Sequence, residues 1–348
     1  MYRYAIIGAG GLGKVHMANL LRLNEERGNV LKLCAVCGTT KEALLQSVSL
    51  NFGTVDISKV DLSDVRFYDD YKELIDTEKP DFAVSATPTF LHAEIAVYAL
   101  SKGVHLYSEK PMALTLEDCD RMMEAARKND RFLMIGQTSR FSHAYGKLRE
   151  YIQSGIYGKA YRFDFCRNSQ MPLWSWNNWI LDPKQSGGCV LDMHIHDVDL
   201  INWFFGKPKA VSAVGTNAKI PMESVSVQYT YDGILGTGRA DWSLPQKYPF
   251  TKRFTVNFEK AVVEISNGKM VVYTDEEAFE PELPPDDIHY EAMKTFLEVI
   301  LDGRSCEQIT SGESIRDSVA IALAEIEAMK TEKTVFIKSN RLSNRKSR

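Results

Sequence analysis

The chain has 348 residues, 44% of them hydrophobic, and this length predicts two domains rather than one. Its 42 Lys and Arg residues against 46 Asp and Glu residues give a formal net charge of -4, without the basic excess typical of duplex nucleic-acid binders. An apolar strand begins almost at once and no run of about eighteen apolar residues follows, so neither a signal peptide nor a membrane span is expected. We therefore expect a cytoplasmic protein without nucleic-acid or membrane partners.

Residues 1–136 alternate between short apolar runs and helical periodicity. Such alternation predicts βαβ units, whose parallel strands are buried on both faces. We therefore predict an α/β fold that begins with a doubly wound Rossmann domain over residues 1–136. Its strands are expected at residues 2–7, 31–37, 82–86, 105–108 and 132–135, with helices such as 90–102 and 116–128 between them.

The pattern changes after residue 136, where strands that alternate with period two become common. Asp-Gly and Asn-Gly turns separate several of them, which predicts a large, mostly antiparallel open sheet. We predict an α+β domain for substrate binding and oligomerisation over residues 137–338, followed by a basic tail at 339–348. Its expected elements are a helix at 145–154, a strand from 161, a helix at about 188–205, strands between 210 and 274, and helices at 290–301 and 313–330.

The predicted open sheet needs cover on both faces, and few helices remain to supply it. Phe254, Val256 and Phe258 alternate along one strand, so we expect this apolar face to contact a second subunit. The sequence thus predicts a homodimer or a homotetramer.

The first predicted strand runs directly into a glycine-rich loop and then into a helix. Gly8, Gly10 and Gly13 supply the G-x-G-x-x-G pattern, with Gly11 and Leu12 before the last glycine. In a βαβ unit the first glycine makes the tight turn, the second lets the backbone approach a pyrophosphate, and the third lets helix and strand pack closely. The helix N-terminus then favours the phosphate charge. These five residues are predicted to bind a dinucleotide cofactor.

The end of the second strand bears on which dinucleotide binds. An NAD site there usually has a carboxylate that accepts hydrogen bonds from the ribose 2′-hydroxyl. Here the strand ends in Gly38, Thr39, Thr40 and Lys41, which tolerate, and could bind, a 2′-phosphate. The pattern favours NADP, and NAD stays open.

The strand at 105–108 is followed by Glu109, Lys110 and Pro111. Strands of a doubly wound sheet point their carboxyl ends into the ligand crevice. Topology alone therefore places Glu109 and Lys110 beside a bound ligand.

The predicted helix at 188–205 carries a possible proton-transfer group. Asp192, His196 and Asp199 stand at i, i+4 and i+7, so they share one face of a regular helix, and carboxylates there would set the tautomer and basicity of the imidazole. At about 100° per residue, His194 is turned roughly 160–200° away, which suits a position in the substrate pocket or behind it. The two histidines diverge and no further ligands are near in sequence, so no metal site is predicted.

Together these motifs resemble the Gfo/Idh/MocA family, named after glucose–fructose oxidoreductase, inositol dehydrogenase and a rhizopine-catabolism protein. The resemblance covers essentially the whole chain except the basic tail. It implies that Lys110, Asp192 and His196 form the catalytic group. The sequence departs from the family pattern at Cys189, where a third glycine is common, and at Gly38, where an acidic residue is common. The residues implied to line the cofactor are Thr87, Pro88, His92, Glu109 and Lys110.

The resemblance also implies reversible oxidation of a secondary alcohol of a sugar, inositol or related polyol, with hydride transfer to the nicotinamide. His196 is expected to take the hydroxyl proton with Asp192 holding it, and Lys110 to stabilise the alkoxide charge. Which of His196 and Lys110 is the formal base stays open. The residues expected to contact the substrate are Lys110, Trp179, Asp192, His194 and His196.

Three questions stay open at this point. Trp179 belongs to a tryptophan-rich loop that is either a platform for sugar rings or part of the core. Some members of the family are glycoside hydrolases that hold NAD, and others are non-catalytic, cofactor-sensing regulators. A regulator is expected to have lost Lys110 or His196, and both are present here.

Overall fold

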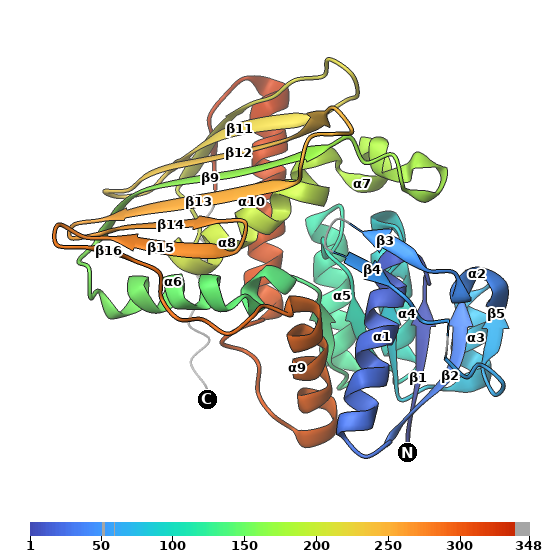
Figure 1. The fold of residues 1–348 in the computed structure, drawn as a ribbon. Helices are drawn as coiled ribbons and strands as arrows, with labels where there is room; N and C mark the ends of the chain where they lie inside the picture. The colour runs from blue at the N-terminus through green and yellow to red at the C-terminus, as the bar shows by residue number, and fades with distance from the viewer. Residues whose placement is uncertain (51–52, 59, 338–348) are drawn as a thin grey trace, which may run out of the picture.

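The computed structural model describes residues 1–50, 53–58 and 60–337, so the predicted basic tail at 339–348 lies outside the described residues. Two domains stack on each other (Figure 1), and the predicted fold class is confirmed. The first domain holds a six-stranded parallel sheet in the Rossmann order β5-β2-β1-β6-β7-β8. Its strands are β1 (Tyr2–Ile7), β2 (Leu31–Cys37), β5 (Arg66–Tyr68), β6 (Phe82–Ser85), β7 (His105–Ser108) and β8 (Leu133–Ile135).

Helices cover both faces of this sheet. Helices α1 and α9 pack on one face, where Phe296 of α9 contacts Phe82, Tyr107 and Phe132, and α3, α4 and α5 pack on the other. The second half of the chain thus supplies a helix to the first domain (Figure 1). The bounds are α1 (Gly11–Glu26), α2 (Lys41–Leu45), α3 (Tyr71–Glu78), η1 (Thr89–Leu91), α4 (His92–Ser101), α5 (Leu116–Lys128), η2 (Thr138–Phe141) and α9 (Ile288–Asp302), with a hairpin of β3 (Val48–Leu50) and β4 (Gly53–Val55).

The second domain is built on a nine-stranded sheet in the order β16-β15-β14-β13-β9-β12-β11-β10-β17. Strands β9 and β12 are parallel, and the other neighbours are antiparallel. Its strands are β9 (Ala160–Gln170), β10 (Ala210–Val214), β11 (Ser224–Thr230), β12 (Leu235–Leu244), β13 (Thr251–Phe258), β14 (Val262–Ser266), β15 (Lys269–Tyr273), β16 (Ala278–Phe279) and β17 (Val335–Phe336). Its helices are α6 (His143–Ser154), η3 (Trp176–Leu181), α7 (Pro183–Ser186), η4 (Val190–His194), α8 (Ile195–Phe205) and α10 (Gly312–Thr331).

The apolar positions of β13 face inward, toward helices of the same chain. Phe254, Val256 and Phe258 are each at most 2% exposed, and Phe254 packs on Tyr145 of α6. The alternate positions carry polar side chains such as the exposed Arg253. The prediction that Phe254, Val256 and Phe258 contact a second subunit is therefore wrong. A homodimer or homotetramer stays a prediction, but the apolar face of β13 no longer supports it.

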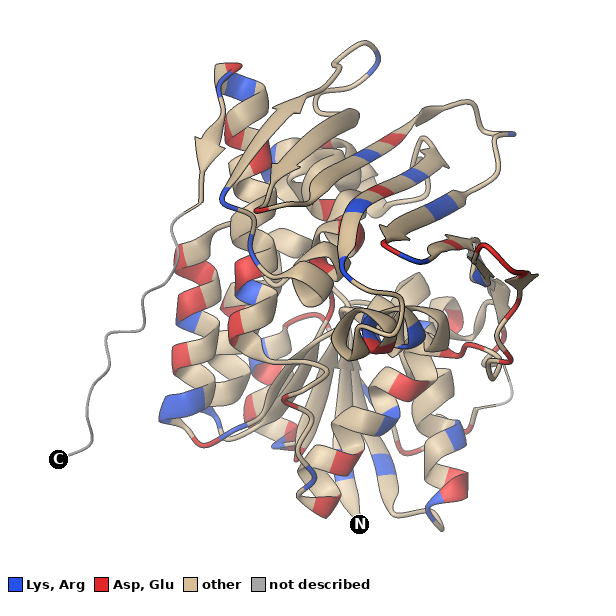
Figure 2. Cartoon of the chain, turned by 90° about the vertical axis from the view of Figure 1, so that its left-hand side faces the viewer, with Lys and Arg blue, Asp and Glu red and all other residues tan. Residues whose placement is uncertain are grey.

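Helix α10 joins the two domains. It packs on α8 and β10 of the second domain and on α5 and β8 of the first. In the cartoon of Figure 2, acidic and basic positions are interspersed along the outer helices rather than gathered in a basic stripe. Within the described residues, no helix is both long and apolar enough to cross a bilayer.

Candidate active site

The glycine-rich loop is tightly packed at its first and last glycines. Gly8 has a φ of +83°, and a Cβ there would lie 2.7 Å from the carbonyl oxygen of Ala86. A Cβ on Gly13 would collide with the carbonyl oxygen of Gly8, so α1 packs directly on the loop. The predicted turn and packing roles of these two glycines are confirmed, because a side chain at either position would push loop and helix apart.

The middle of the loop is open. Gly10 is exposed, and a Cβ added there would meet nothing within 4 Å. Gly11 and Leu12 begin α1, whose N-terminus has no side-chain cap and no acidic residue in its first turn. Its unpaired backbone N–H groups and helix dipole favour an anion next to Gly10. The loop therefore fits the pyrophosphate of a dinucleotide.

The loop after β7 is anchored to α1. Oε1 of Glu109 lies 2.6 Å from Nε2 of His16, and Glu109 is 5% exposed. Burial raises the pKa of Glu109, but the hydrogen bond to His16 and the nearby Lys110 lower it by more, so it lies below its ordinary value. Glu109 is therefore a buried carboxylate that fixes the backbone from which Lys110 extends.

The loop after β6 is tied to the same place by His92. Its Nε2 lies 3.0 Å from the carbonyl oxygen of Thr87 and its Nδ1 lies 2.8 Å from that of Pro111. His92 is 1% exposed, whereas Thr87 and Pro88 are only partly buried. His92 thus links two loops that border the crevice, and it presents no free ring nitrogen to a cofactor.

The end of β2 forms an open shelf beside the crevice. Gly38 has a φ of +81° with nothing within 4 Å of its Cβ position, and Thr39 is partly buried beside it. Thr40 caps α2 by accepting from the N–H of Ala43, and Lys41 is exposed. The space next to Gly38 is therefore not filled by other atoms of the described residues.

The neighbouring strand brings a feature that sequence reasoning missed. Strand β5 pairs with β2 so that Tyr68 lies beside Cys37, and Asp69 and Asp70 follow directly. Burial, and then the charges of Asp70 and Asp69, raise the pKa of Cys37 to about 11. Carboxylates therefore stand near the end of β2, although none stands within it. The three-residue strand β5 was too short for its alternation to be visible in the sequence.

Lys110 and Asp192 meet across the two domains. The Nζ of Lys110 lies 2.6 Å from the carbonyl oxygen of Asp192 and 3.2 Å from its Oδ1. The two side chains are 14% and 18% exposed. Lys110 follows β7 of the Rossmann sheet, whereas Asp192 lies in η4 of the second domain. The structure thus joins two of the three predicted catalytic residues at the carboxyl edge of the parallel sheet.

His196 lies beside this pair on the first turn of α8. It is partly exposed, and its Nδ1 is buried with no hydrogen-bond partner among the described residues. Burial lowers the pKa of His196, and the charges of Lys110, Arg167 and Lys252 lower it further, to well below its ordinary value. The imidazole is therefore neutral at physiological pH, and it can accept a proton.

The predicted regular helix is wrong in its first turns. Residues Val190–His194 form a π-helical turn, a feature often found at functional sites, and its wider winding breaks the expected i, i+4, i+7 stripe. Asp199 is fully buried and accepts two 2.7 Å hydrogen bonds from Arg140. Among the described residues, neither Asp192 nor Asp199 hydrogen-bonds to His196. The expectation that carboxylates hold this histidine is therefore wrong.

Two predicted substrate contacts have different outcomes. His194 is 0% exposed, and its ring nitrogens lie 3.3 Å from Oδ2 of Asp197 and 3.2 Å from Oη of Tyr229. Its predicted contact with substrate is wrong, and the alternative position behind the pocket is the one observed. Trp179 is partly buried and packs against the core, while Trp174 and Trp176 of its loop are 56% and 71% exposed. The contact of Trp179 with substrate stays a prediction.

Several titratable residues near the site were missed because they come from distant elements. Arg167 of β9, Lys252 of β13 and His289 of α9 all lower the pKa of His196, and no local motif marks them. His16 had a signal, since it stands three residues after Gly13 on α1. Within the described ranges, no group of three or more His, Cys, Asp or Glu side chains is arranged to hold a metal ion.

Known proteins resemble this chain over much or all of its length. Myo-inositol 2-dehydrogenase from Thermotoga maritima is 26% identical over 96% of this chain and 98% of its own length. D-glucoside 3-dehydrogenase from Escherichia coli is 29% identical over 62% of this chain and 57% of its own length. The match to myo-inositol 2-dehydrogenase therefore extends along both domains.

Solved structures share the fold. UDP-N-acetylglucosamine 3-dehydrogenase from Acidithiobacillus ferrooxidans superposes with a TM-score of 0.74 at 21% identity, covering 95% of this chain and 98% of its own. An oxidoreductase from Thermotoga maritima superposes with a TM-score of 0.79 at 20% identity, covering 97% and 98%.

Family profiles match both domains in order. Residues 2–137 match the oxidoreductase family with an NAD-binding Rossmann fold, and residues 145–264 match the C-terminal domain of the same family. With the glycine-rich loop, the Lys110–Asp192 contact and the open antiparallel sheet in their places, the chain belongs to the Gfo/Idh/MocA family of oxidoreductases.

Proposed function

We propose that this protein is an NAD(P)-dependent dehydrogenase that oxidises a secondary alcohol of a sugar, an inositol or a related polyol. The contact of Lys110 with Asp192 beside His196 carries this proposal, because it gathers a donor, a carboxylate and a neutral base at the edge of a dinucleotide-binding sheet. The names of relatives support the substrate class, since two of them act on myo-inositol and D-glucosides.

The residues divide the work of the reaction. The nicotinamide cofactor, which the glycine-rich loop would hold, would supply the hydride acceptor for the carbinol carbon. His196, neutral because of its lowered pKa, takes the hydroxyl proton on a ring nitrogen. Lys110 donates a hydrogen bond to the same oxygen and stabilises its developing negative charge, while Asp192 holds the ammonium in place. The alcohol thereby loses a hydride and a proton and becomes a ketone.

A substrate screen tests this proposal. Inositols, aldoses and glycosides are offered with NAD and with NADP, and both reduced cofactor and released sugar are measured. A dehydrogenase reduces one equivalent of cofactor for each ketone formed. Free sugar without net cofactor reduction would instead indicate the glycoside hydrolase, and cofactor binding without turnover of any substrate would indicate the regulator.

We propose NADP as the preferred cofactor, on the basis of the open shelf at the end of β2. Gly38→Asp should shift the preference toward NAD by about tenfold or more, because a carboxylate repels a 2′-phosphate and accepts from a 2′-hydroxyl. Gly38→Asn is the matched control, since it brings the same size and the same positive φ without the charge. The ratio of kcat/KM for the two cofactors is measured. A tenfold preference of the parent for NAD would contradict the proposal and point to Asp69 as the ribose acceptor.

The glycine-rich loop is proposed to hold the pyrophosphate. Gly10→Val should weaken cofactor binding at least tenfold, because its side chain fills the open space next to the N-terminus of α1. Gly146→Val is the control, since Gly146 of α6 also has open space around its Cβ position but lies in the other domain. Calorimetric titration with cofactor gives the affinities. If folded Gly10→Val protein bound the cofactor as tightly as the wild type, the glycine-rich loop would not be part of the cofactor site.

A further inference from the structure

A cluster of buried polar side chains lies directly behind the π-helical turn. Its five members come from β9, η4, α8, β11 and α10, and each is at most 4% exposed. A Cβ added to Gly238 of β12 would lie 3.0 Å from Oη of Tyr229 and 3.2 Å from Cε1 of His194, so this strand packs on both rings. We call the five residues the buried polar cluster. They are Arg167, His194, Asp197, Tyr229 and Glu325.

The contacts of the cluster form one continuous path. Arg167 donates to Oδ1 of Asp197 through Nε at 2.9 Å and Nη2 at 2.6 Å. Nδ1 of His194 lies 3.3 Å from Oδ2 of Asp197, and its Nε2 lies 3.2 Å from Oη of Tyr229. Oη of Tyr229 in turn lies 2.8 Å from Oε1 of Glu325. The path therefore connects Asp197, which follows His196 in α8, to Glu325 of α10, the helix that joins the two domains.

Donor and acceptor counting shows that the path needs one proton beyond that of the tyrosine. With Nδ1–H of His194 donating to Asp197, Nε2–H can donate to Tyr229 while the tyrosine O–H donates to a Glu325 carboxylate. Alternatively, a protonated Glu325 donates to Tyr229, whose O–H donates to Nε2. If that proton is absent, the single tyrosine O–H satisfies Nε2 or the carboxylate, and the other is left buried and unpaired.

We propose that His194, Tyr229 and Glu325 hold one shared proton, and that this proton keeps the π-helical turn where Asp192 and His196 can act. His194 stands two residues from each of them, inside the turn that presents Asp192 to Lys110. It is therefore a positioning residue. The inference rests on the proposed function, since Asp192 and His196 have their roles there.

Charges around the cluster set the pH at which the proton leaves. Burial lowers the pKa of His194, but Glu325 and Asp197 raise it by more, so it lies above its ordinary value. Burial raises the pKa of Glu325 to about 7. The proton is therefore held below neutral pH, and it is lost as the pH rises through about 7. The charged and titratable groups of the cluster around His194 are Arg167 from β9, Asp197 from α8, Tyr229 from β11 and Glu325 from α10. Those outside it are Tyr231, which follows β11, and Lys252 of β13 and Lys110 nearer the crevice.

Glu325→Gln tests the proton directly. The amide has the shape of a carboxyl group but no proton to lose, and its NH₂ can donate to Tyr229 while the tyrosine donates to His194. The variant should keep its kcat at pH 7, and its alkaline loss of kcat should move upward by about one pH unit or more. An alkaline limb that coincides with that of the wild type would overturn the proposal.

Tyr229→Phe tests the path. The substitution removes one hydroxyl group and breaks both of its contacts, so kcat should fall by about tenfold to a hundredfold while cofactor affinity stays unchanged. The fall should be present at neutral pH, where Glu325→Gln is active. A wild-type kcat in Tyr229→Phe would show that the π-helical turn keeps its position without the Tyr229 hydroxyl between His194 and Glu325.

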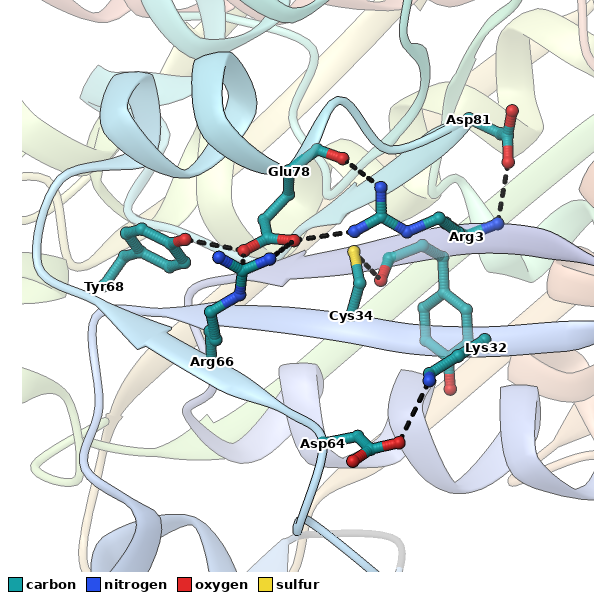
Figure 3. A network of polar contacts seen from close by, with 9 residues as sticks. Arg3, Lys32, Cys34, Asp64, Arg66, Tyr68, Glu78 and Asp81 are labelled. Atoms are coloured by element: carbon teal, nitrogen blue, oxygen red, sulfur yellow. Dashed lines mark hydrogen bonds and ion pairs between the residues drawn. The ribbon is translucent and has the colours of Figure 1, made fainter.

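Glu78→Gln is the matched control. Glu78 is 1% exposed and accepts from Oη of Tyr68 at 2.6 Å, as Glu325 accepts from Tyr229, but it lies with Arg3 and Arg66 in the Rossmann domain (Figure 3). Loss of the Glu78 carboxylate should change the stability of the folded protein, but it should not move the pH at which kcat falls on the alkaline side. A shift equal to that of Glu325→Gln would assign the effect to general destabilisation and contradict the positioning role.

Thermal unfolding between pH 7 and about pH 9.5 tests the shared proton without turnover. The unfolding midpoint of the wild type should fall relative to that of Glu325→Gln as the pH rises, while Glu78→Gln follows the wild type. If the unfolding midpoints of the wild type and Glu325→Gln changed equally with pH, the proposal of a shared proton would be overturned. Diverging midpoints in a protein without dehydrogenase activity would defeat the proposed function and the positioning role, and the shared proton alone would stand.

Discussion

Lys110→Met should lower kcat by about 10²-fold or more and leave cofactor affinity nearly unchanged. The substitution keeps most of the length of the side chain but removes the ammonium that contacts Asp192 and is proposed to stabilise the alkoxide charge. Because Glu109 and His16 hold the backbone at this point, the loop itself should keep its place. Stopped-flow turnover and calorimetric cofactor binding give the two quantities.

A second lysine of the same domain supplies the control. Lys102 pairs with Asp76 at 2.6 Å on the surface, so Lys102→Met also removes a lysine from an ion pair. It should leave kcat close to that of the wild type. A kcat for Lys110→Met within tenfold of the wild type would remove Lys110 from the chemistry.

His196→Asn should lower kcat by about 10²-fold or more, since it removes the proposed base. In the wild type, activity should be lost on the acid side as the pH falls through the lowered pKa of His196, well below the ordinary value for histidine. Lys110→Met removes a positive charge that lowers this pKa, so its residual activity should show an acid limb at higher pH. The pH dependence of kcat/KM measures both limbs.

Two outcomes would contradict the role of His196. One is an acid limb that stays in place in Lys110→Met, because the two groups would then be uncoupled. The other is a persistent acid limb in His196→Asn, which would assign it to another group. His143→Asn is a control, since His143 pairs with Asp286 at 3.1 Å and does not contact Lys110 or Asp192 among the described residues.

The Rossmann domain could be predicted from sequence because its signals are local. Each strand is a short apolar run, and the roles of Gly8 and Gly13 follow from the strand-turn-helix around them. Lys110 could be placed for the same reason, since strand ends in such a sheet meet at one edge. Its contact with Asp192 shows that Lys110 lies where the two domains meet, at the sheet edge that the topological argument predicted.

The part of the site that the second domain contributes was predicted less accurately than the Rossmann part, because a single turn departs from α-helical geometry. The stripe of Asp192, His196 and Asp199 assumed a regular helix, whereas the π-helical turn leaves Asp199 facing Arg140 in the core. Contacts such as that of Glu325 with Tyr229 join elements about a hundred residues apart in the chain. No spacing in the sequence reports such a contact.

Transfer of deuterium from substrate to cofactor tests the central claim most directly. A polyol that the screen identifies is labelled with deuterium at the carbon that is oxidised, and the reduced cofactor is analysed by mass spectrometry after one turnover. We predict one deuterium atom in the reduced nicotinamide for each ketone formed. The transfer should be strongly slowed in Lys110→Met and His196→Asn. Product formation with an unlabelled or unreduced cofactor would contradict hydride transfer and, with it, the proposed dehydrogenase.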